Sequence, residues 1–224
     1  MVNIIGHRGA AGIAPENTIP GFRQAVEIGV DGVEFDVRRA ADGTLVILHD
    51  AQVDRTTDGA GAIEQLDLAT LQSLDAGNGA GIPTLPETVQ FFSAHDVELH
   101  IDLKTRGVGT ETIDLLIEHH LQDRTIVFSS LPDEVAAIAT DGVRTGYSVS
   151  DVTTEALDHA ASHHVDFILG PARADRTAVE RIQAAGLLAG LSTINDRDEL
   201  ETAIALRPYS VLTDRPDLAV GRGR

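Results

Sequence analysis

The 224-residue sequence predicts an α/β fold, a (β/α)8 or TIM barrel with one hairpin strand added to it. Short segments rich in Val, Ile and Leu alternate with longer segments of helical periodicity, which is typical of βα units on a parallel sheet. The sequence contains nine candidate strands, and we assign the one that exceeds the barrel's need to the hairpin. A doubly wound open sheet is the alternative, but no Gly-x-Gly-x-x-Gly sequence follows the first strand.

Apolar spacing and the residues that begin or end helices define each element. The predicted strands cover residues 2–5, 31–38, 45–50, 98–104, 125–129, 144–148, 166–169, 187–194 and 210–213. The predicted helices cover residues 18–29, 63–74, 82–95, 110–121, 132–140, 154–164, 176–185 and 197–206. Asn17 or Thr18 is suited to cap the first helix, and Asn195-Asp196 precedes the last.

The predicted site is built around the first strand of the hairpin. In that strand Val33, Phe35 and Val37 alternate with Glu34 and Asp36. Because side chains alternate faces along a strand, the two carboxylates share one face and the three apolar side chains share the other. Solvent-facing polar residues are also common on strands, so the alternation by itself leaves a plain solvated face as an alternative.

The turn of the hairpin sets which residues face each other. Asp42-Gly43 between two apolar segments is a strong turn signal. If the turn has two residues, Ala41 pairs with Thr44, and counting back along both strands sets Asp36 opposite His49. The hairpin therefore predicts two acids and an imidazole on one surface.

The charge of the chain excludes some partners. The net charge is -18 with a pI near 4.7, so the phosphates of nucleic acids and anionic membranes would meet a negative field. Lys104 is the one lysine, whereas arginine is the routine cation. Strong acidity with little lysine suggests a halophilic protein from a high-salt cytoplasm, where salt screens the self-repulsion. There is no cysteine, so disulfides and thiolate chemistry are excluded.

The chain shows no internal repeat, linker or low-complexity tract, so we expect one domain over residues 1–224. It begins without a basic segment and a long apolar run, and no secretory signal is visible. Its longest apolar stretch, residues 184–191, is too short to cross a bilayer. We therefore expect a cytoplasmic protein without stable membrane association. The oligomeric state, including a homo-oligomer, is left open.

Polar side chains gather where the active site of such a barrel lies, at the carboxyl ends of the strands. The candidates there are His7, Arg8, Glu34, Asp36, His49, Asp102 and Lys104. Three converging carboxylates repel one another unless a cation lies between them, and a hard divalent ion such as Mg²⁺ or Ca²⁺ meets that need. A raised pKa on one carboxyl is the alternative, and zinc is less favoured without thiolates.

These side chains suit acid–base chemistry on a phosphate ester. Arg8 offers a planar fork for phosphate oxygens, and Lys104 offers a compact charge. One of the two histidines can take a proton from the nucleophile while the other gives one to the leaving alcohol.

Six blocks of the sequence resemble the glycerophosphodiester phosphodiesterases, in the family's order and over nearly the whole chain. The blocks are Gly6-His7-Arg8-Gly9, Pro15-Glu16-Asn17-Thr18, Val33-Glu34-Phe35-Asp36-Val37, Val46-Ile47-Leu48-His49-Asp50, Ile82-Pro83-Thr84-Leu85 and Leu212-Thr213-Asp214-Arg215-Pro216. The resemblance implies a TIM barrel and metal-dependent hydrolysis of glycerophosphodiesters to glycerol 3-phosphate and an alcohol, in lipid or glycerol metabolism. It also implies that residues 50–81 are a short version of the family's small insertion.

The resemblance implies roles for single residues. His7 and His49 would be the acid–base pair, and Glu34, Asp36 and Asp102 would hold the ion.

The remaining implied roles concern the substrate. Arg8 and Lys104 would bind the phosphate, and Glu16 and Asn17 would lie by the site, with Asn17 contacting the ligand.

Two positions depart from the family's pattern. The family's strand usually reads Ile-Glu-x-Lys, whereas this chain has Asp102, one methylene shorter, which leaves open whether it binds the metal directly. Near the penultimate strand the family often has Trp-Thr-x-Asn, and this chain has Leu191 in place of the aromatic residue. The substrate preference is therefore less determined than the chemistry.

Other polar residues have simpler interpretations. We expect His100 to be a hydrogen-bonded barrel residue, Ser129 and Ser130 to end a strand, and Thr213-Asp214 to brace the barrel mouth.

Two other functions remain as alternatives. One is a phospholipase-type phosphodiesterase, which the acidic surface and the lack of an amphipathic membrane-binding helix oppose. The other is a non-catalytic barrel that binds glycerol phosphates. The sequence leaves open the alcohol head group, the native ion, and whether a cyclic phosphate forms.

Overall fold

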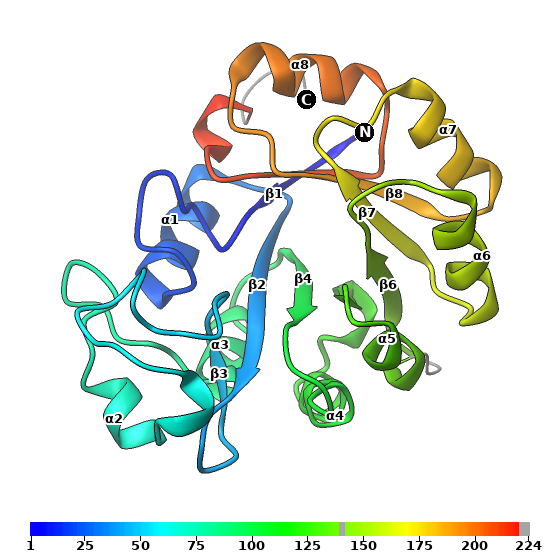
Figure 1. The fold of residues 1–224 in the computed structure, drawn as a ribbon. Coiled ribbons are helices and arrows are strands. Elements are labelled where there is room, and N and C mark those ends of the chain that lie inside the picture. The colour runs from blue at the N-terminus through cyan, green and yellow to red at the C-terminus, as the bar shows by residue number, and fades with distance from the viewer. Residues whose placement is uncertain (139–141, 220–224) are drawn as a thin grey trace.

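The computed structural model describes residues 1–138 and 142–219. In this part of the chain eight parallel strands close into a barrel, with β1 pairing to β9 on one side and to β2 on the other (Figure 1). The barrel strands are β1 (Asn3–Gly6), β2 (Gly32–Arg39), β4 (Glu98–Leu103), β5 (Thr125–Ser129), β6 (Arg144–Ser148), β7 (Phe167–Pro171), β8 (Leu188–Ser192) and β9 (Ser210–Thr213). The predicted (β/α)8 barrel is therefore confirmed.

Helices follow the strands and cover the outside of the barrel (Figure 1). They are α1 (Ile19–Ile28), α3 (Leu85–Phe92), α4 (Gly109–Glu118), α5 (Pro132–Ile138), α6 (Thr154–Ser162), α7 (Arg176–Ala184) and α8 (Arg197–Ala205). Among the described residues, no helix combines the length and the apolar character needed to cross a membrane. The end of the predicted helix 132–140 lies outside the described residues.

Capping residues set where these helices begin. Thr18 caps α1 and Asp196 caps α8 by accepting hydrogen bonds from backbone N–H groups of the first turn. At α3, Thr84 and Glu87 form a capping box, in which each side chain bonds the other residue's backbone N–H.

The hairpin is real, but its predicted register is wrong by one residue. β3 (Leu45–Ile47) pairs antiparallel to β2 with Val37 opposite Ile47. The Ala40 N–H donates to the Thr44 carbonyl, so the turn has three residues, and Gly43 adopts the left-handed φ of 90° that such a turn requires. Leu48, not His49, therefore lies opposite Asp36, because its N–H donates to the Asp36 carbonyl.

The apolar faces of β2 and β4 lie against the covering helices, as the alternation predicts. Phe35 of β2 packs between Phe22 of α1 and Phe92 of α3, with ring centroids 5.7 Å and 5.8 Å away. All three rings are fully buried. The opposite face of each strand, which carries the acidic residues, is thereby turned into the barrel.

Residues 50–81 form a small unit beside the hairpin, outside the ring of strands (Figure 1). The single predicted helix over residues 63–74 is two short pieces, a 3-10 turn at Ile63–Gln65 and α2 at Leu68–Gln72. Asp67 interrupts them because its extended backbone and side chain cap α2. Eight buried apolar residues form a hydrophobic cluster that this unit shares with the hairpin and with Ile82: Ala40, Val46, Leu48, Val53, Ile63, Leu71, Ala76 and Ile82.

Candidate active site

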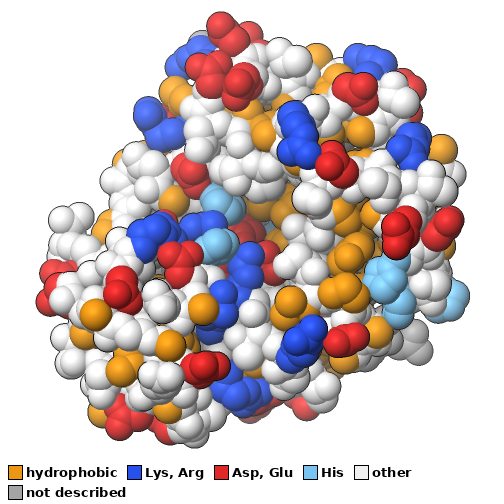
Figure 2. Space-filling model, viewed as in Figure 1, with side chains coloured by type: hydrophobic (Ala, Val, Ile, Leu, Met, Phe, Trp, Pro, Cys, Tyr) orange, Lys and Arg blue, Asp and Glu red, His pale blue; other side chains and the backbone are white. Residues whose placement is uncertain are grey.

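The predicted site residues meet in a cavity of about 320 Å³ at the carboxyl ends of the strands. Figure 2 shows histidine, lysine and arginine side chains around a hollow near the centre of this face, with hydrophobic side chains on its other side. The predicted residues that line the cavity are His7, Arg8, Glu34, Asp36, His49, Asp102 and Lys104. The topology brings them together because the carboxyl ends of parallel barrel strands lie at one face.

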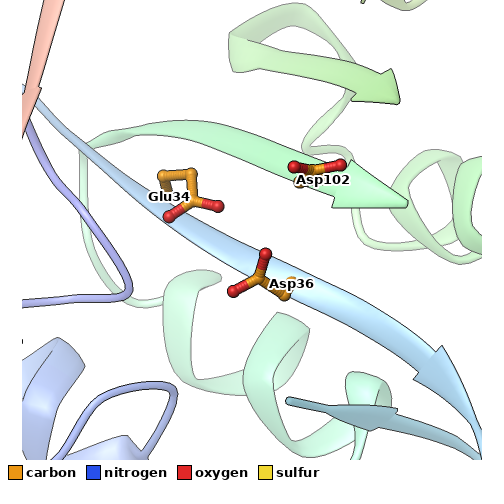
Figure 3. A group of neighbouring side chains, drawn as sticks. All are labelled: Glu34, Asp36 and Asp102. Carbon is orange, nitrogen blue, oxygen red and sulfur yellow. The ribbon is translucent and has the colours of Figure 1, made fainter. Parts of the chain in front are cut away.

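Three buried carboxylates form the floor of this site. Glu34 and Asp36 project from β2 and Asp102 projects from the adjacent β4, where it lies level with Asp36 in the strand register (Figure 3). One oxygen from each lies within 4.8 Å of the others. The three side chains are buried.

Two carboxylate oxygens of the acidic cluster accept no hydrogen bond from the described residues and could bind a cation. Within the described part of the chain, Asp102 Oδ1 is buried without a hydrogen-bond partner. Asp36 Oδ1 also lacks a hydrogen bond and has only the Lys104 ammonium 3.3 Å away. Burial raises the pKa of Glu34 and of Asp102, whereas Lys104 and Arg8 outweigh burial and lower the pKa of Asp36. An oxygen-only set of this kind fits Mg²⁺ or Ca²⁺.

His7 lies over the cluster and is held by a residue from the far end of the chain. Its Nδ1 is 2.7 Å from Asp214 Oδ1, and its Nε2 is 3.8 Å from Glu34 Oε2. Burial alone would lower the pKa of His7, but Glu34 and Asp214 outweigh it and raise that pKa. Asp214 is fixed in turn by Asn195, whose Nδ2 donates to Asp214 Oδ2 over 2.5 Å. Asp214 thus does more than brace the barrel mouth.

His49 reaches the cavity from the loop after β3 and has its own carboxylate partner. Its Nδ1 is 2.6 Å from Oδ1 of Asp50, the next residue in the chain. Burial and the charges of Arg8 and Lys104 lower the pKa of His49 against the opposing pull of Asp36 and Asp50. In each histidine the carboxylate contact occupies Nδ1, so Nε2 is the nitrogen left for proton transfer, although Nε2 of His7 also lies 3.8 Å from Glu34 Oε2.

The two cations of the site are fixed by the carboxylates. Lys104 Nζ donates to Asp102 Oδ2 over 2.6 Å. The Arg8 backbone N–H donates to Glu34 Oε2 over 2.8 Å, and its Nη1 donates to Glu16 Oε1 over 2.9 Å. Both side chains line the cavity, where their remaining N–H groups can bind an anion.

Asn17 lies behind the carboxylate floor. Its side chain is buried, with Nδ2 donating to Asp36 Oδ2 over 2.7 Å and Oδ1 accepting from the Asp36 N–H over 3.3 Å. It is not among the side chains that line the cavity in the described residues, so the geometry places it as a support for Asp36.

The loop after β1 is held in a strained conformation. Arg8 and Asn17 have positive φ angles of 50° and 55°, which residues other than glycine seldom adopt. A Cβ at Gly6 would lie 2.2 Å from the Gly9 carbonyl oxygen, so the tight return of this loop requires glycine there.

The far wall of the cavity was not predicted. It is formed by loops after β6, β7 and β8 and includes Ser148–Ser150, Arg173 and Ser192-Thr193. Among the described residues that line the cavity, none is Phe, Tyr or Trp. The loops after β6 and β7 carry no motif, and the only signal for the loop after β8 was the family pattern near Leu191.

Other expected structural roles agree with the structure. His100 is fully buried inside the barrel, and its Nε2 lies 2.7 Å from Glu98 Oε1. Ser129 ends β5 and donates to the Leu103 carbonyl over 2.7 Å. Neither side chain lines the cavity in the described part of the protein.

Comparison with known proteins gives one family. The model of the glycerophosphoryl diester phosphodiesterase family matches residues 7–218. A putative glycerophosphodiester phosphodiesterase of Bacillus subtilis is 30% identical over 99% of this chain and 98% of its own length. The glycerophosphodiester phosphodiesterase of Caldanaerobacter subterraneus is 37% identical over 56% of this chain, a match that spans only 57% of that relative.

Solved structures agree with the sequence relatives. A putative glycerophosphoryl diester phosphodiesterase from Agrobacterium tumefaciens superposes with a TM-score of 0.89 at 27% identity, over 98% of this chain and 96% of that one. A phosphodiesterase from Oleispira antarctica, in complex with its product sn-glycerol-3-phosphate, has a TM-score of 0.88 at 31% identity, over 96% of this chain and 94% of that one.

Proposed function

The chain belongs to the glycerophosphoryl diester phosphodiesterase family, and we propose that it hydrolyses glycerophosphodiesters to sn-glycerol 3-phosphate and an alcohol with the help of a divalent metal ion. The observation that carries the proposal is the pairing of two carboxylate-bound histidines, His7 and His49, over three buried carboxylates. The product complex of the Oleispira antarctica phosphodiesterase supports the choice of product.

The histidines act as the acid–base pair. The carboxylate at each Nδ1 keeps the ring in one tautomer and leaves Nε2 facing the cavity. One ring accepts the proton of the attacking water or glycerol hydroxyl as its oxygen bonds to phosphorus, and the other donates a proton to the alcohol oxygen as its bond to phosphorus breaks. If the glycerol hydroxyl attacks, water then opens the cyclic phosphate to give glycerol 3-phosphate. Asp214 orients His7 and Asp50 orients His49.

Arg8 and Lys104 bind the phosphate. The guanidinium of Arg8 and the ammonium of Lys104 are anchored to carboxylates, so they meet the phosphate oxygens without reorganising. Asn17 contributes through Asp36, which it holds by two hydrogen bonds.

Glu34, Asp36 and Asp102 would hold the metal ion. Asp36 Oδ1 and Asp102 Oδ1, which accept no hydrogen bond within the described part of the chain, are the oxygens that would bind it. The Mg²⁺ or Ca²⁺ that they would hold would supply positive charge against the charge that develops on the phosphoryl oxygens. The shorter Asp102 is within 4.8 Å of the other two donors, a spacing that fits one shared ion.

A phospholipase-type activity and a non-catalytic binding barrel are the other two functions. The cavity of about 320 Å³ favours a small water-soluble diester over an intact phospholipid. The pairing of both histidines with carboxylates favours turnover over binding alone, because a binding site needs no oriented proton carriers.

Release of glycerol 3-phosphate tests the proposal. Glycerophosphocholine and glycerophosphoethanolamine would be supplied in high KCl, first with EDTA and then with Mg²⁺ or Ca²⁺ restored. We expect release that requires the metal and that falls by at least about a thousandfold in His7→Ala, since an acid–base group is lost. The His119→Ala variant, changed at the end of α4 away from the cavity, is the matched control.

Two outcomes would contradict the proposal. Release that persists in EDTA would show that the reaction needs no metal ion. Binding of glycerol 3-phosphate by both the wild type and His7→Ala, without release from either diester, would identify a binding protein.

A further inference from the structure

An arginine outside the barrel joins the two loops that carry Arg8 and His49. Arg55 lies in the insertion, and its Nε donates to Asp50 Oδ2 over 2.6 Å. Its Nη1 and Nη2 donate to Glu16 Oε2 and Oε1 over 2.8 Å and 2.7 Å. All three guanidinium nitrogens therefore contact carboxylates, and these carboxylates come from two separate loops.

Each of these carboxylates also contacts a residue of the catalytic cavity. The second oxygen of Asp50 lies 2.6 Å from His49 Nδ1. Glu16 Oε1 also accepts from Arg8 Nη1 over 2.9 Å. A continuous chain of charge-assisted hydrogen bonds thus runs from His49 through Asp50, Arg55 and Glu16 to Arg8.

The insertion holds Arg55 in place from outside. Val53, two residues before it, is fully buried in the insertion's hydrophobic cluster. The Thr57 N–H and hydroxyl both donate to the Val53 carbonyl, over 3.1 Å and 2.9 Å, which closes the turn that carries Arg55. The Arg55 side chain is 48% exposed, so the chain loses little core packing without it.

We propose that Arg55 is a positioning residue of the active site, which orients His49 through Asp50 and Arg8 through Glu16. The proposal rests on the phosphodiesterase function proposed above and assigns the insertion a role in it. Exposed ion pairs add little to folding stability. Their effect here is on geometry, because Asp50 and Glu16 would otherwise be free to rotate away from the groups that they orient.

The shape of the guanidinium matters as well as its charge. A lysine at position 55 would keep the charge, but one ammonium cannot make the planar fork to Glu16 and reach Asp50 at the same time. Arg55→Lys should therefore behave much more like Arg55→Gln than like the wild type.

The first test compares turnover with stability in the metal-loaded 224-residue chain. We expect Arg55→Gln and Arg55→Lys to lower kcat for glycerophosphocholine by about tenfold to a hundredfold, the size of effect that small misplacements of catalytic groups produce. The melting temperature should stay within about 3 °C of the wild type, as for other exposed pairs. Arg176→Gln, at an exposed arginine of α7, is the matched control and should change neither quantity.

A double-mutant cycle tests the route through Asp50. If Arg55 acts through Asp50, adding Arg55→Gln to Asp50→Asn should lower kcat by much less than Arg55→Gln does alone. Fully additive losses would overturn that route. Wild-type kcat in Arg55→Gln or in Arg55→Lys would overturn the proposal as a whole.

A second readout is independent of turnover. Nitrogen NMR resonances report the tautomer of each histidine ring, and Arg55→Gln should shift those of His49 while those of His7 stay unchanged. Unchanged His49 resonances would overturn the positioning role. If the wild type released no glycerol 3-phosphate, the proposed function would fail, and this measurement would still decide whether Arg55 orients His49.

Discussion

The pKa values of the two histidines of the site shift in opposite directions. The His7 side chain is 14% exposed and lies between Glu34 and Asp214, which raise its pKa despite the cost of burial. His49 is 33% exposed at its side chain, and burial with the charge of Arg8 nearby lowers its pKa. Pairs of groups whose pKa values are pushed apart are typical of acid–base catalysis.

We predict that Asp214→Asn lowers kcat by at least about a hundredfold, because the amide disturbs the tautomer of His7. Asn195 Nδ2 donates to one oxygen of Asp214 and His7 contacts the other. In the amide, the oxygen can serve only one of these donors, so its NH₂ group would face either His7 or Asn195.

The measurement is the steady-state rate of glycerol 3-phosphate release. Asp217→Asn is the control, since Asp217 pairs with Arg215 away from the cavity. Equal rates for Asp214→Asn and the wild type would show that His7 needs no carboxylate partner.

At the scale of elements, β4 carries a different cluster at each end of one face. Asp102 at the carboxyl end belongs to the acidic floor of the site. Glu98 at the amino end accepts hydrogen bonds from His100 Nε2 over 2.7 Å, from the Tyr209 hydroxyl over 2.5 Å and from Arg144 Nη2 over 3.1 Å. One strand thus carries a residue of the active site at its carboxyl end and the hydrogen-bonded cluster around Glu98 at its amino end.

We predict that Glu98 makes stability fall in acid. Burial would raise its pKa, but the hydrogen bonds from His100 and Tyr209 and the charge of Arg144 lower it to about 2. Because the folded pKa is depressed from 4.5, the stabilisation is present above that pH and is lost as pH falls toward 2, by at most about 3 kcal/mol.

Denaturant unfolding across this pH range checks the prediction. The free-energy gap between the wild type and Glu98→Gln should shrink as pH falls, because only the carboxylate becomes protonated. A gap that is constant with pH would mean that Glu98 contributes through packing alone.

For the whole molecule, the net charge of -18 opposes compactness through self-repulsion. The exposed face of α4 gives a local example, since Asp114 and Glu118 lie one turn apart with the same charge. Salt screens such pairs, and the screening length falls from about 10 Å at 0.1 M to about 3 Å at 1 M.

We predict that the melting temperature rises with KCl over this range of about 0.1 to 1 M. Replacing the pair by Asp114→Asn and Glu118→Gln should raise the melting temperature at low salt and flatten its dependence on KCl. Thermal unfolding at several KCl concentrations measures both. A melting temperature that does not change up to molar salt would contradict the halophilic interpretation.

Local pattern was enough to predict most of the fold. The alternation in β2 predicted which face carries Glu34 and Asp36, because side-chain direction in a strand depends only on position. Helix starts were predictable where a cap is a single side chain, as at Asp196. The hairpin register was not, because Asp42-Gly43 is compatible with turns of two or three residues, and packing of the strands selects between them.

By itself, the sequence determined the barrel, the acidic floor and the position of His7, Arg8 and Lys104 beside it, because these depend on strand periodicity and on the common end of parallel strands. The hairpin register that set His49 opposite Asp36 was wrong, and the loop after β3 brings His49 to these residues instead.

Only the tertiary structure decided which groups orient the side chains of the site. Asp214 reaches His7 across 207 positions and Arg55 reaches Glu16 across 39, and no local pattern encodes such contacts. They exist because barrel closure brings β9 beside β1 and the insertion packs beside the hairpin.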